Sequence, residues 1–361
     1  MSIHCIALLG RQDKPTDAVE EYCRYLGSAL EAHDFQLEIR RVPWEINGWR
    51  DALHALQLQA ARWRGTWVLL QYTALGWSSR GFPQRVLRTL KILKSAGVRI
   101  AIVYHDVEPY HGSRLVDRLR RAVQLRTMRS AIRLSELAIF TIPLNNVSWL
   151  SSPVPQAHFI PVGPNLPIPE TSSSVGDPHE FPTIGVFSIT GGAAGARETD
   201  TILSSVRYAA KRLGRLRLLV FGRHAELREA ELRQGLKDMP IELSVEGVVQ
   251  PDQVIRKLSA CDLLLFIRGP ISTRRSSALA GIACGLPIIA YPGTETAPPI
   301  TDAGIVLVPP DQPDDLNAAL VRVLSDDTYR GNLAARSRAA YKTYFAWAAI
   351  AARFSTLLNT R

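Results

Sequence analysis

The chain has 361 residues, of which 46% are hydrophobic and 21% charged, so it is long enough for two globular domains and is neither disordered nor fibrous in composition. Its formal net charge is +10, and residues 1–165 carry 21 Lys and Arg against 13 Asp and Glu. This excess favours anionic partners, among them nucleic acid, lipid headgroups and phosphorylated substrates, without choosing between them.

The four cysteines lie scattered in apolar runs, and none is spaced as a metal or redox pair, which favours a reducing cytoplasm. The first residues carry no basic leader before an apolar stretch, and no apolar run approaches the ~20 residues that a membrane span needs. We therefore expect a cytoplasmic protein.

In chain order, the first half alternates short apolar runs with amphipathic runs. The first helix has Thr16 or Asp17 as its candidate N-cap. The spacing predicts strands at 3–9, 35–42, 67–72, 98–104, 136–142 and 158–161, and helices at 16–33, 49–63, 84–94 and 115–134. The last of these helices has an apolar stripe that we expect to face the core, formed by Leu115, Leu119, Ala122, Leu125, Met128 and Ile132.

Residues 163–182 are rich in proline and contain the run Thr171-Ser-Ser-Ser, which is typical of a linker. A second alternating series follows. It predicts strands at 183–188, 216–221, 241–245, 263–267, 287–290 and 305–308, and helices at 198–213, 276–284 and from 314 onward. The last helix, 344–358, is expected to return to the first domain.

Strands that alternate with helices predict parallel sheets with right-handed crossovers. Because the pattern occurs twice, we expect an α/β chain of two facing Rossmann-like domains with a ligand site in the cleft between them. The expected parts are a first domain at 1–165, a linker at 166–182, a second domain at 183–342 and a C-terminal helix at 343–361.

Residues 260–310 carry a family resemblance. Ala260-Cys-Asp262 leads into a strand, and Ala283-Cys-Gly285-Leu-Pro287 and Pro292-Gly293 follow in order. This series resembles the carboxyl-terminal core of the retaining GT-B glycosyltransferases of the bacterial group 1 type. The resemblance implies a donor domain for a nucleoside-diphosphate sugar in the second half, an acceptor domain in the first half, and no metal or other cofactor; no Asp-x-Asp metal pair is evident.

One departure from that family concerns the donor loop. The family usually has two glutamates eight positions apart, where this chain has Ser272 and Ala280. The run from Ser272 through Thr273, Arg274, Arg275 and Ser276 to Ser277 is basic and rich in hydroxyls instead. Helix N-termini and arginines both bind phosphate, so we expect this run to hold the donor diphosphate. The alternative is ordinary helix capping with two solvated arginines.

Other candidate donor-binding residues are weaker. Gly191 and Gly192 lie between a strand and a helix, and the resemblance places a phosphate-binding cation near them, for which Arg197 is the nearby candidate. Arg223 follows a strand, and Val248 lies in the segment that resembles the family's base-binding loop. A flexible glycine loop and solvated arginines are the alternatives.

On the acceptor side, His105 follows a predicted strand, and the family has a histidine in this loop near the donor sugar. We expect His105 to be catalytic, together with Arg274 and Arg275, while Asp106 or Glu108 serves the acceptor. Gly10 and Arg11 follow the first strand and are further candidates. A histidine that merely ties down its loop, and a plain surface loop, are the alternatives.

The function that this predicts is transfer of a sugar to a hydroxyl of a glycan, polysaccharide or lipid-linked acceptor, with retention. The alternative is a non-catalytic nucleotide-sugar or glycan-binding protein with a GT-B shell, because the glutamates are missing. Nucleic acid is not expected as a partner, since no recognised binding module is present. Arg114, Arg118 and Arg121 form a stripe that predicts either a solvated helix face or attraction to an anionic membrane or a polyanionic acceptor.

Overall fold

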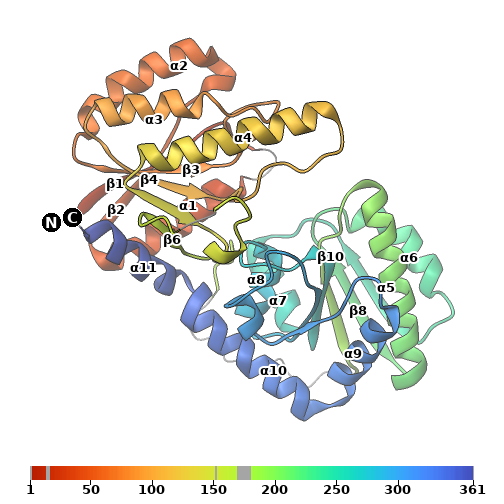
Figure 1. Ribbon diagram of the computed structural model, residues 1–361. Coiled ribbons are helices and arrows are strands. Elements are labelled where there is room, and N and C mark those ends of the chain that lie inside the picture. The colour runs from red at the N-terminus through yellow and green to blue at the C-terminus, as the bar shows by residue number, and fades with distance from the viewer. Residues whose placement is uncertain (1, 14–16, 151–152, 169–179, 361) are drawn as a thin grey trace. The chain divides into compact units, whose positions relative to one another are not determined.

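The computed structural model describes residues 2–13, 17–150, 153–168 and 180–360, and it divides into two compact units (Figure 1). The first unit comprises residues 1–163 and 347–361, and the second comprises residues 164–346. Thr16, most of the expected linker and the Thr171-Ser-Ser-Ser run lie outside the described residues. Among the described residues, no helix combines enough length with enough apolarity to cross a bilayer.

The first unit is a parallel six-stranded sheet in the order β2-β1-β3-β4-β5-β6. Helices α2, α3 and α4 cover one face, where they bury Ile6, Leu70 and Tyr104, and α1 packs with α11 on the other face (Figure 1). The bounds are β1 Ile3–Leu9, α1 Ala18–Leu30, β2 Phe35–Arg41, α2 Trp44–Ala60, β3 Trp67–Tyr72, α3 Val86–Ser95, β4 Arg99–Tyr104, α4 Leu115–Leu134, β5 Leu137–Phe140, β6 Ala157–Phe159 and α11 Trp347–Asn359.

The second unit is a parallel six-stranded sheet in the order β12-β11-β10-β7-β8-β9. Helices α5, α6 and α9 pack on one face, and α8 packs on the other, next to α7 and α10. The bounds are β7 Thr183–Phe187, α5 Gly192–Leu213, β8 Leu216–Phe221, α6 Glu229–Leu236, β9 Ile241–Glu246, α7 Pro251–Ser259, β10 Leu263–Pro270, α8 Ser276–Ala283, β11 Ile288–Tyr291, β12 Ile305–Leu307, α9 Pro313–Ser325 and α10 Asp327–Ala340.

The C-terminal helix α11 belongs to the first unit, as expected for a GT-B fold. A five-residue π-helical turn, Tyr341–Phe345, precedes it. Trp67 Nε1 donates to the carbonyl of Leu358 at 2.9 Å, and the Arg99 guanidinium donates to the carbonyl of Thr360 at 3.0 Å. These bonds fix the end of the chain beside the starts of β3 and β4.

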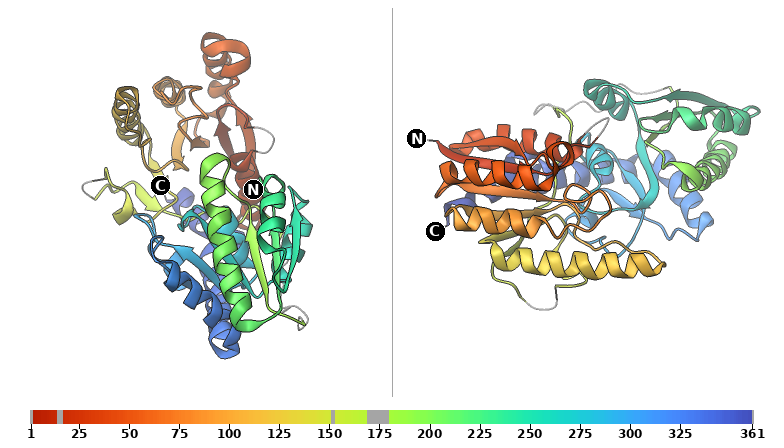
Figure 2. Two further views of the ribbon diagram at one scale, coloured as in Figure 1. Left: turned by 90° about the vertical axis from the view of Figure 1, so that its right-hand side faces the viewer. Right: turned by 90° about the horizontal axis from the view of Figure 1, so that it is seen from above.

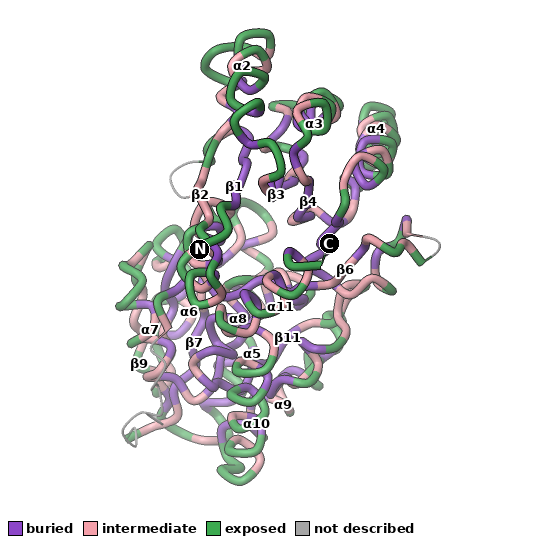
Figure 3. Tube along the Cα trace, turned by 90° about the vertical axis from the view of Figure 1, so that its left-hand side faces the viewer, coloured by how far each residue is buried: buried purple, intermediate pink, exposed green. Residues whose placement is uncertain are grey.

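The predicted core stripe of α4 is wrong over the first half of the helix. Leu115 and Leu119 are 81% and 59% exposed, and Ala122 is exposed too. The buried face starts instead with Asp117 and Gln124, whose side chains bond Arg120 and the loop at Gly81. Figure 2 shows α4, in yellow, at the outer side of the first unit, and Figure 3 colours much of its outer face as exposed.

Most other bounds differ from the predictions by three residues or fewer, but α2 begins at Trp44, five residues before the expected start, and two further differences bear on the site. Helix α5 begins at Gly192, six residues before the expected start, so the glycine run forms its first turn. Strand β10 extends to Pro270, which places Arg268 within it. Asp17 is the N-cap of α1, and its carboxylate accepts from the amides of Val19 and Glu20.

Candidate functional site

Positive charge is concentrated at the carboxyl edge of the second sheet. Arg223 follows β8, Arg268 lies near the end of β10, and Arg275 is the N-cap of α8. Burial lowers the pKa of Arg268, and the charge of Arg223 adds to that shift, whereas Glu198 opposes it. A cation that lowers the pKa of another lies close to it, so positive charge gathers at this edge, which suits an anion.

The loop that carries Arg275 is tied to the loop after β11. The Ile271 amide donates to the Tyr291 carbonyl at 2.9 Å, and the Thr296 hydroxyl donates to the Ile271 carbonyl at 2.6 Å. A Cβ on Gly293 would lie 2.4 Å from Pro270 Cβ, so only glycine permits this approach. The two loops therefore form one support beneath the start of α8, in which Ser272 and Thr273 are buried.

Arg274 and Arg275 are adjacent, but their side chains have different surroundings. The Arg274 guanidinium donates through Nε and Nη2 to the two carboxylate oxygens of Glu295, both at 2.7 Å. Burial raises the pKa of Glu295, but the hydrogen bonds and charge of Arg274 outweigh it and hold that pKa below its usual value. Among the described residues, by contrast, Arg275 Nε is buried without a hydrogen-bond partner.

The pKa of Arg275 is lowered, first by burial and then by the charges of Arg274 and Arg268, although Glu295 opposes the shift. The side chain of Arg275, the N-cap residue, makes no hydrogen bond to the backbone amides at the start of α8. A desolvated guanidinium beside the first amides of a helix is an arrangement that binds phosphate or another anion.

The remaining donor-side candidates lie on neighbouring loops of the same unit. Gly191 is the N-cap of α5, and a Cβ there would lie 3.4 Å from the ring of His224, which directly follows Arg223. Gly192 has φ 66° and its carbonyl accepts from Arg228 at 2.6 Å. Arg197 is exposed in the second turn of α5, and Val248 is 68% exposed after β9. Ser276 and Ser277 are the first two residues of α8.

The first unit has a cavity of about 300 Å³ at the carboxyl edge of its own sheet. Three predicted acceptor-side residues line it, namely Gly10, Arg11 and Asp106. A Cβ on Gly10 would lie 2.0 Å from the Gly76 carbonyl oxygen, which also accepts from the Arg11 amide at 2.9 Å. The glycine thus lets the loop after β1 approach the loop after β3 and form the wall.

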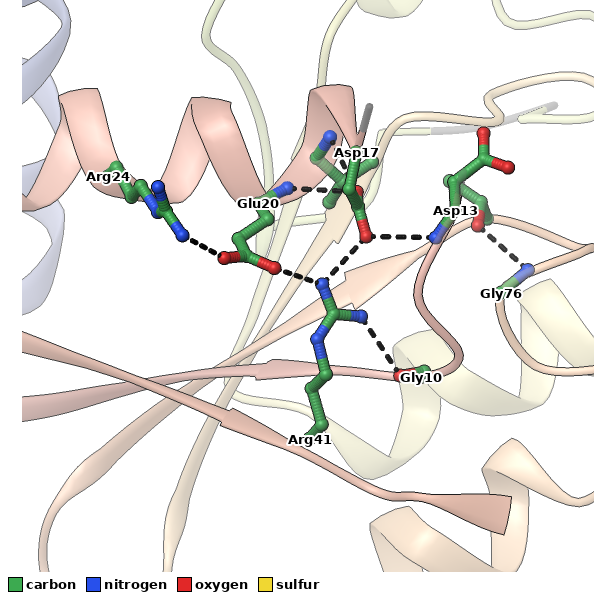
Figure 4. A network of polar contacts seen from close by, with 9 residues as sticks. Gly10, Asp13, Asp17, Glu20, Arg24, Arg41 and Gly76 are labelled. Atoms are coloured by element: carbon green, nitrogen blue, oxygen red, sulfur yellow. Dashed lines mark hydrogen bonds and ion pairs between the residues drawn. The ribbon is translucent and has the colours of Figure 1, made fainter. Parts of the chain in front are cut away.

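A network of charges braces one side of this cavity (Figure 4). Arg41 donates to Asp17 at 2.7 Å, to Glu20 at 2.5 Å and to the Gly10 carbonyl at 3.3 Å. Burial raises the pKa of Asp17, but hydrogen bonds from Arg41 and backbone amides outweigh it and lower that pKa. The pKa of Glu20 is lowered mainly by its hydrogen bond from Arg41. The network ties β2, α1 and the cavity loop together.

His105 lies beside the cavity rather than in its lining. Its Nε2 is 2.8 Å from Oε1 of Gln71, a lining residue whose Nε2 donates to the Leu69 carbonyl. With the Gln71 amide oriented in this way, Nε2 of His105 donates the hydrogen bond to Gln71 Oε1. The ring also meets Tyr22 edge-on, with 4.9 Å between centroids.

The two carboxylates of this loop hold other loops in place. Asp106 accepts from the Ala74 amide at 2.7 Å, and Glu108 accepts from the amide and hydroxyl of Ser148 at 2.6 and 2.5 Å. Only Asp106 lines the cavity. A loop-anchoring role therefore accounts for Glu108 without any acceptor.

The sequence analysis missed three polar residues of these two edges: Arg268, Glu295 and Gln71. Arg268 and Gln71 interrupt apolar strand runs near their carboxyl ends, and a polar residue at that position was a usable signal. Glu295 has no comparable signal, because its pairing with Arg274 depends on how two loops fold together.

A search with family models matches residues 188–326 to "Glycosyl transferases group 1". A search of curated proteins gives no match. Residues 188–326 contain the start of α5, the arginine-rich edge and the paired loops after β10 and β11.

Solved structures with the same fold cover nearly the whole chain. HepE of Anabaena, in complex with UDP and glucose, has a TM-score of 0.63 at 14% identity and covers 99% of this chain and 100% of its own. Sucrose-phosphate synthase of Thermosynechococcus elongatus has a TM-score of 0.67 at 16% identity, with 99% and 98% covered.

WaaG, a glycosyltransferase of lipopolysaccharide biosynthesis, has a TM-score of 0.57 at 14% identity, with 99% and 100% covered. At these identities the likeness establishes the fold, while the family match lies in the second unit. The chain therefore has the GT-B fold, with two Rossmann-like sheets and the returning helix α11, and its residues 188–326 match the family model of the group 1 glycosyltransferases.

Proposed function

We propose that the second unit binds the diphosphate of a nucleotide sugar at Arg275 and the start of α8, and that the sugar is transferred, with retention, to a hydroxyl of an acceptor held by the first unit. The observation that carries this proposal is the half-buried Arg275 side chain, whose buried Nε has no hydrogen-bond partner among the described residues. Burying a charged group without a partner costs free energy, and an anionic ligand offsets that cost.

Arg274 and Arg275 then have separate roles. Arg274 braces the loop through Glu295, because both carboxylate oxygens accept from its guanidinium. Arg275, helped by Arg268 and the amides of α8, stabilises the negative charge that builds on the leaving diphosphate as the sugar bond breaks. Ser272, Thr273, Ser276, Ser277, Gly191 and Gly192 are proposed to shape the site, with Arg223 at its rim.

On the acceptor side we assign the cavity of the first unit to a sugar ring. Asp106, Arg11 and Gln71 offer hydrogen-bonding groups along its wall, and Leu9 and Leu75 offer apolar ones. His105 is proposed to handle the proton of the acceptor hydroxyl or to bond a donor-sugar hydroxyl. Because HepE was solved with UDP and glucose and WaaG acts in lipopolysaccharide biosynthesis, a UDP-sugar and a glycan or lipid-linked acceptor are the first substrates to test.

We also propose that the first unit attaches reversibly to an anionic membrane at the cytoplasmic face. Leu115, Val116 and Leu119 of α4 are 81%, 47% and 59% exposed, and Arg118 and Arg121 flank them. Helix α3, which packs beside α4, exposes four more basic side chains: Arg85, Arg88, Lys91 and Lys94.

Neither helix exposes a carboxylate. Helix α3 has no acidic residue, and the single one on α4, Asp117, is buried and pairs with Arg120 at 2.6 Å. Exposed leucines beside clustered arginines suit insertion into an anionic lipid surface, whereas a soluble polyanion would need only the charges.

Liposome sedimentation tests this attachment. We expect binding to vesicles with anionic lipid that weakens as salt rises, because charges are screened within ~8 Å at physiological salt. Leu115→Ser with Leu119→Ser should weaken binding without changing the net charge, and Leu58→Ser, an exposed leucine on α2, is the control. Failure to bind anionic vesicles would remove the membrane from the proposal, and equal binding to neutral vesicles would contradict the role of the basic side chains.

The donor assignment is tested by a thermal-shift series with UDP, other nucleoside diphosphates and the free nucleosides. A ligand of the native state raises the melting temperature by mass action, so a diphosphate should raise it and the matching nucleoside should raise it far less. Transfer assays with UDP-sugars and a panel of glycan acceptors then test turnover. Diphosphate binding without any transfer would favour a binding protein, and no diphosphate binding would contradict the site.

A further inference from the structure

The two places where the chain passes between its units lie against each other on the first unit. The chain leaves this unit after Gly163 and returns at Trp347. A Cβ built on Gly163 would lie 2.6 Å from Cε2 of the Trp347 ring, which is closer than real contacts allow. Glycine at 163 is therefore what lets the indole lie flat on the outgoing chain.

Two tyrosines of α1 also contact this indole. Tyr25 stacks on Trp347, with centroids 5.7 Å apart and an angle of 14° between the ring planes. Tyr22 meets Trp347 edge-on at 5.3 Å and is itself only 3% exposed. Aromatic pairs at these separations are attractive, and a packed interior transmits a displacement from one ring to the next.

Tyr22 also forms the edge-on contact with His105, at 4.9 Å and 82°. The His105 ring is thus held by Tyr22 and by its 2.8 Å hydrogen bond with Gln71. The rings of Trp347, Tyr22 and His105 form a continuous array from the two chain crossings to the edge of the acceptor cavity. This array lies wholly within the first unit.

We propose that Tyr22 and Trp347 are positioning residues that set the orientation of His105, so that the path of the chain at its two crossings is coupled to the ring proposed to take part in transfer. The effect of this coupling on activity rests on the proposed function, because the orientation of His105 affects the rate of transfer only if His105 takes part in it. The packing itself can be tested without turnover.

The test is the NMR spectrum of the full chain labelled with ¹³C and ¹⁵N in histidine and tryptophan. The protein has eight histidines, and the His105 signals are assigned by their loss in His105→Gln. Gly163→Ala adds a methyl that must displace Trp347, and we expect the ring signals of His105 to move more than those of any other histidine.

Gly27→Ala is the matched control, because it adds the same methyl on α1 but meets Leu37 at an ordinary 3.4 Å. It should leave His105 unchanged. The double variant Gly163→Ala with Trp347→Phe provides room for the methyl and should return the His105 signals toward those of the wild type. A purely local effect at position 163 would give no such rescue.

Trp347→Leu removes the support of Tyr22 without touching His105 and should also move its signals. Unchanged His105 signals in both Gly163→Ala and Trp347→Leu would overturn the proposal. If these signals move while His105→Ala transfers sugar at the wild-type rate, the packing array stands and the catalytic role of His105 is the part that fails.

Discussion

The carboxyl edges of the two parallel six-stranded sheets differ in how their charges are arranged. At the first edge, Asp17, Glu20 and Arg41 neutralise one another around a cavity, and each carboxylate has a pKa below its ordinary value. At the second edge, Arg223, Arg268 and Arg275 crowd together, and burial lowers the pKa of two of them. A sheet edge whose charges are paired is suited to a neutral polyhydroxyl ligand. A sheet edge with an excess of partly buried cations is suited to phosphate.

The largest expected effect is on the rate of sugar transfer, and it concerns His105 at the carboxyl edge of the first sheet. His105→Ala should lower kcat for sugar transfer by about a hundredfold or more, the usual contribution of a positioned acid–base group. The melting temperature should change far less, since the hydrogen bond with Gln71 and the edge-on contact with Tyr22 that the variant loses are each contacts with a single side chain. His111→Ala, which removes an exposed histidine nearby, is the control and should keep the native rate. Native turnover in His105→Ala would leave the first edge with a binding role alone.

The next effect concerns stability. Asp17→Ala removes the N-cap of α1 and leaves the half-buried Arg41 with fewer partners, so the free energy of unfolding should fall by about 2–3 kcal/mol. Asp13→Ala is the matched control, because Asp13 is exposed and its contact with Asp17 uses its backbone amide. Urea unfolding of the full chain measures both. Equal losses in the two variants would mean that the network does not brace the first edge.

A smaller expected effect is a loss of folding stability at low pH, which arises from the paired carboxylates of the first sheet edge. The folded-state pKa values of Asp17 and Glu20 are lowered, so their pairing stabilises the fold at neutral pH, and that stability is lost as pH falls below about 4. Urea unfolding at pH 7 and near pH 3.5 should show this loss, and Asp17→Asn should show less of it because its side chain no longer titrates. An identical acid dependence in the two proteins would contradict the assigned role of Asp17.

Much of the fold follows from the sequence, since short apolar runs that alternate with amphipathic helical runs predict two parallel sheets whose strands the structure contains. The failures have physical causes. The apolar stripe of α4 predicts a buried face, but Leu115 and Leu119 lie on the solvent side because Asp117 and Gln124 make buried hydrogen bonds on the other face. Periodicity reports which side chains share a face and says nothing about which face meets the core.

The candidate site was predictable only in part. The run at 272–277 stands out in sequence because two arginines precede a helix, and the structure places it at the carboxyl edge of the second sheet. What the sequence could not supply is the difference between the two arginines. It depends on Glu295, which lies 21 residues away and reaches Arg274 only because Gly293 and Thr296 bring its loop against Pro270 and Ile271.

Arg274 is paired with Glu295, whereas Arg275 is proposed to hold the diphosphate. Calorimetric titration of UDP and of uridine tests this difference most directly. Arg275→Ala should weaken UDP binding by about 1.5–3 kcal/mol, the scale of hydrogen bonds to charged groups, and should leave uridine binding almost unchanged. Arg274→Ala, which leaves Arg275 in place, should weaken UDP binding less. UDP binding to Arg275→Ala at wild-type strength, or an equal loss for UDP and uridine, would show that this arginine does not hold the diphosphate.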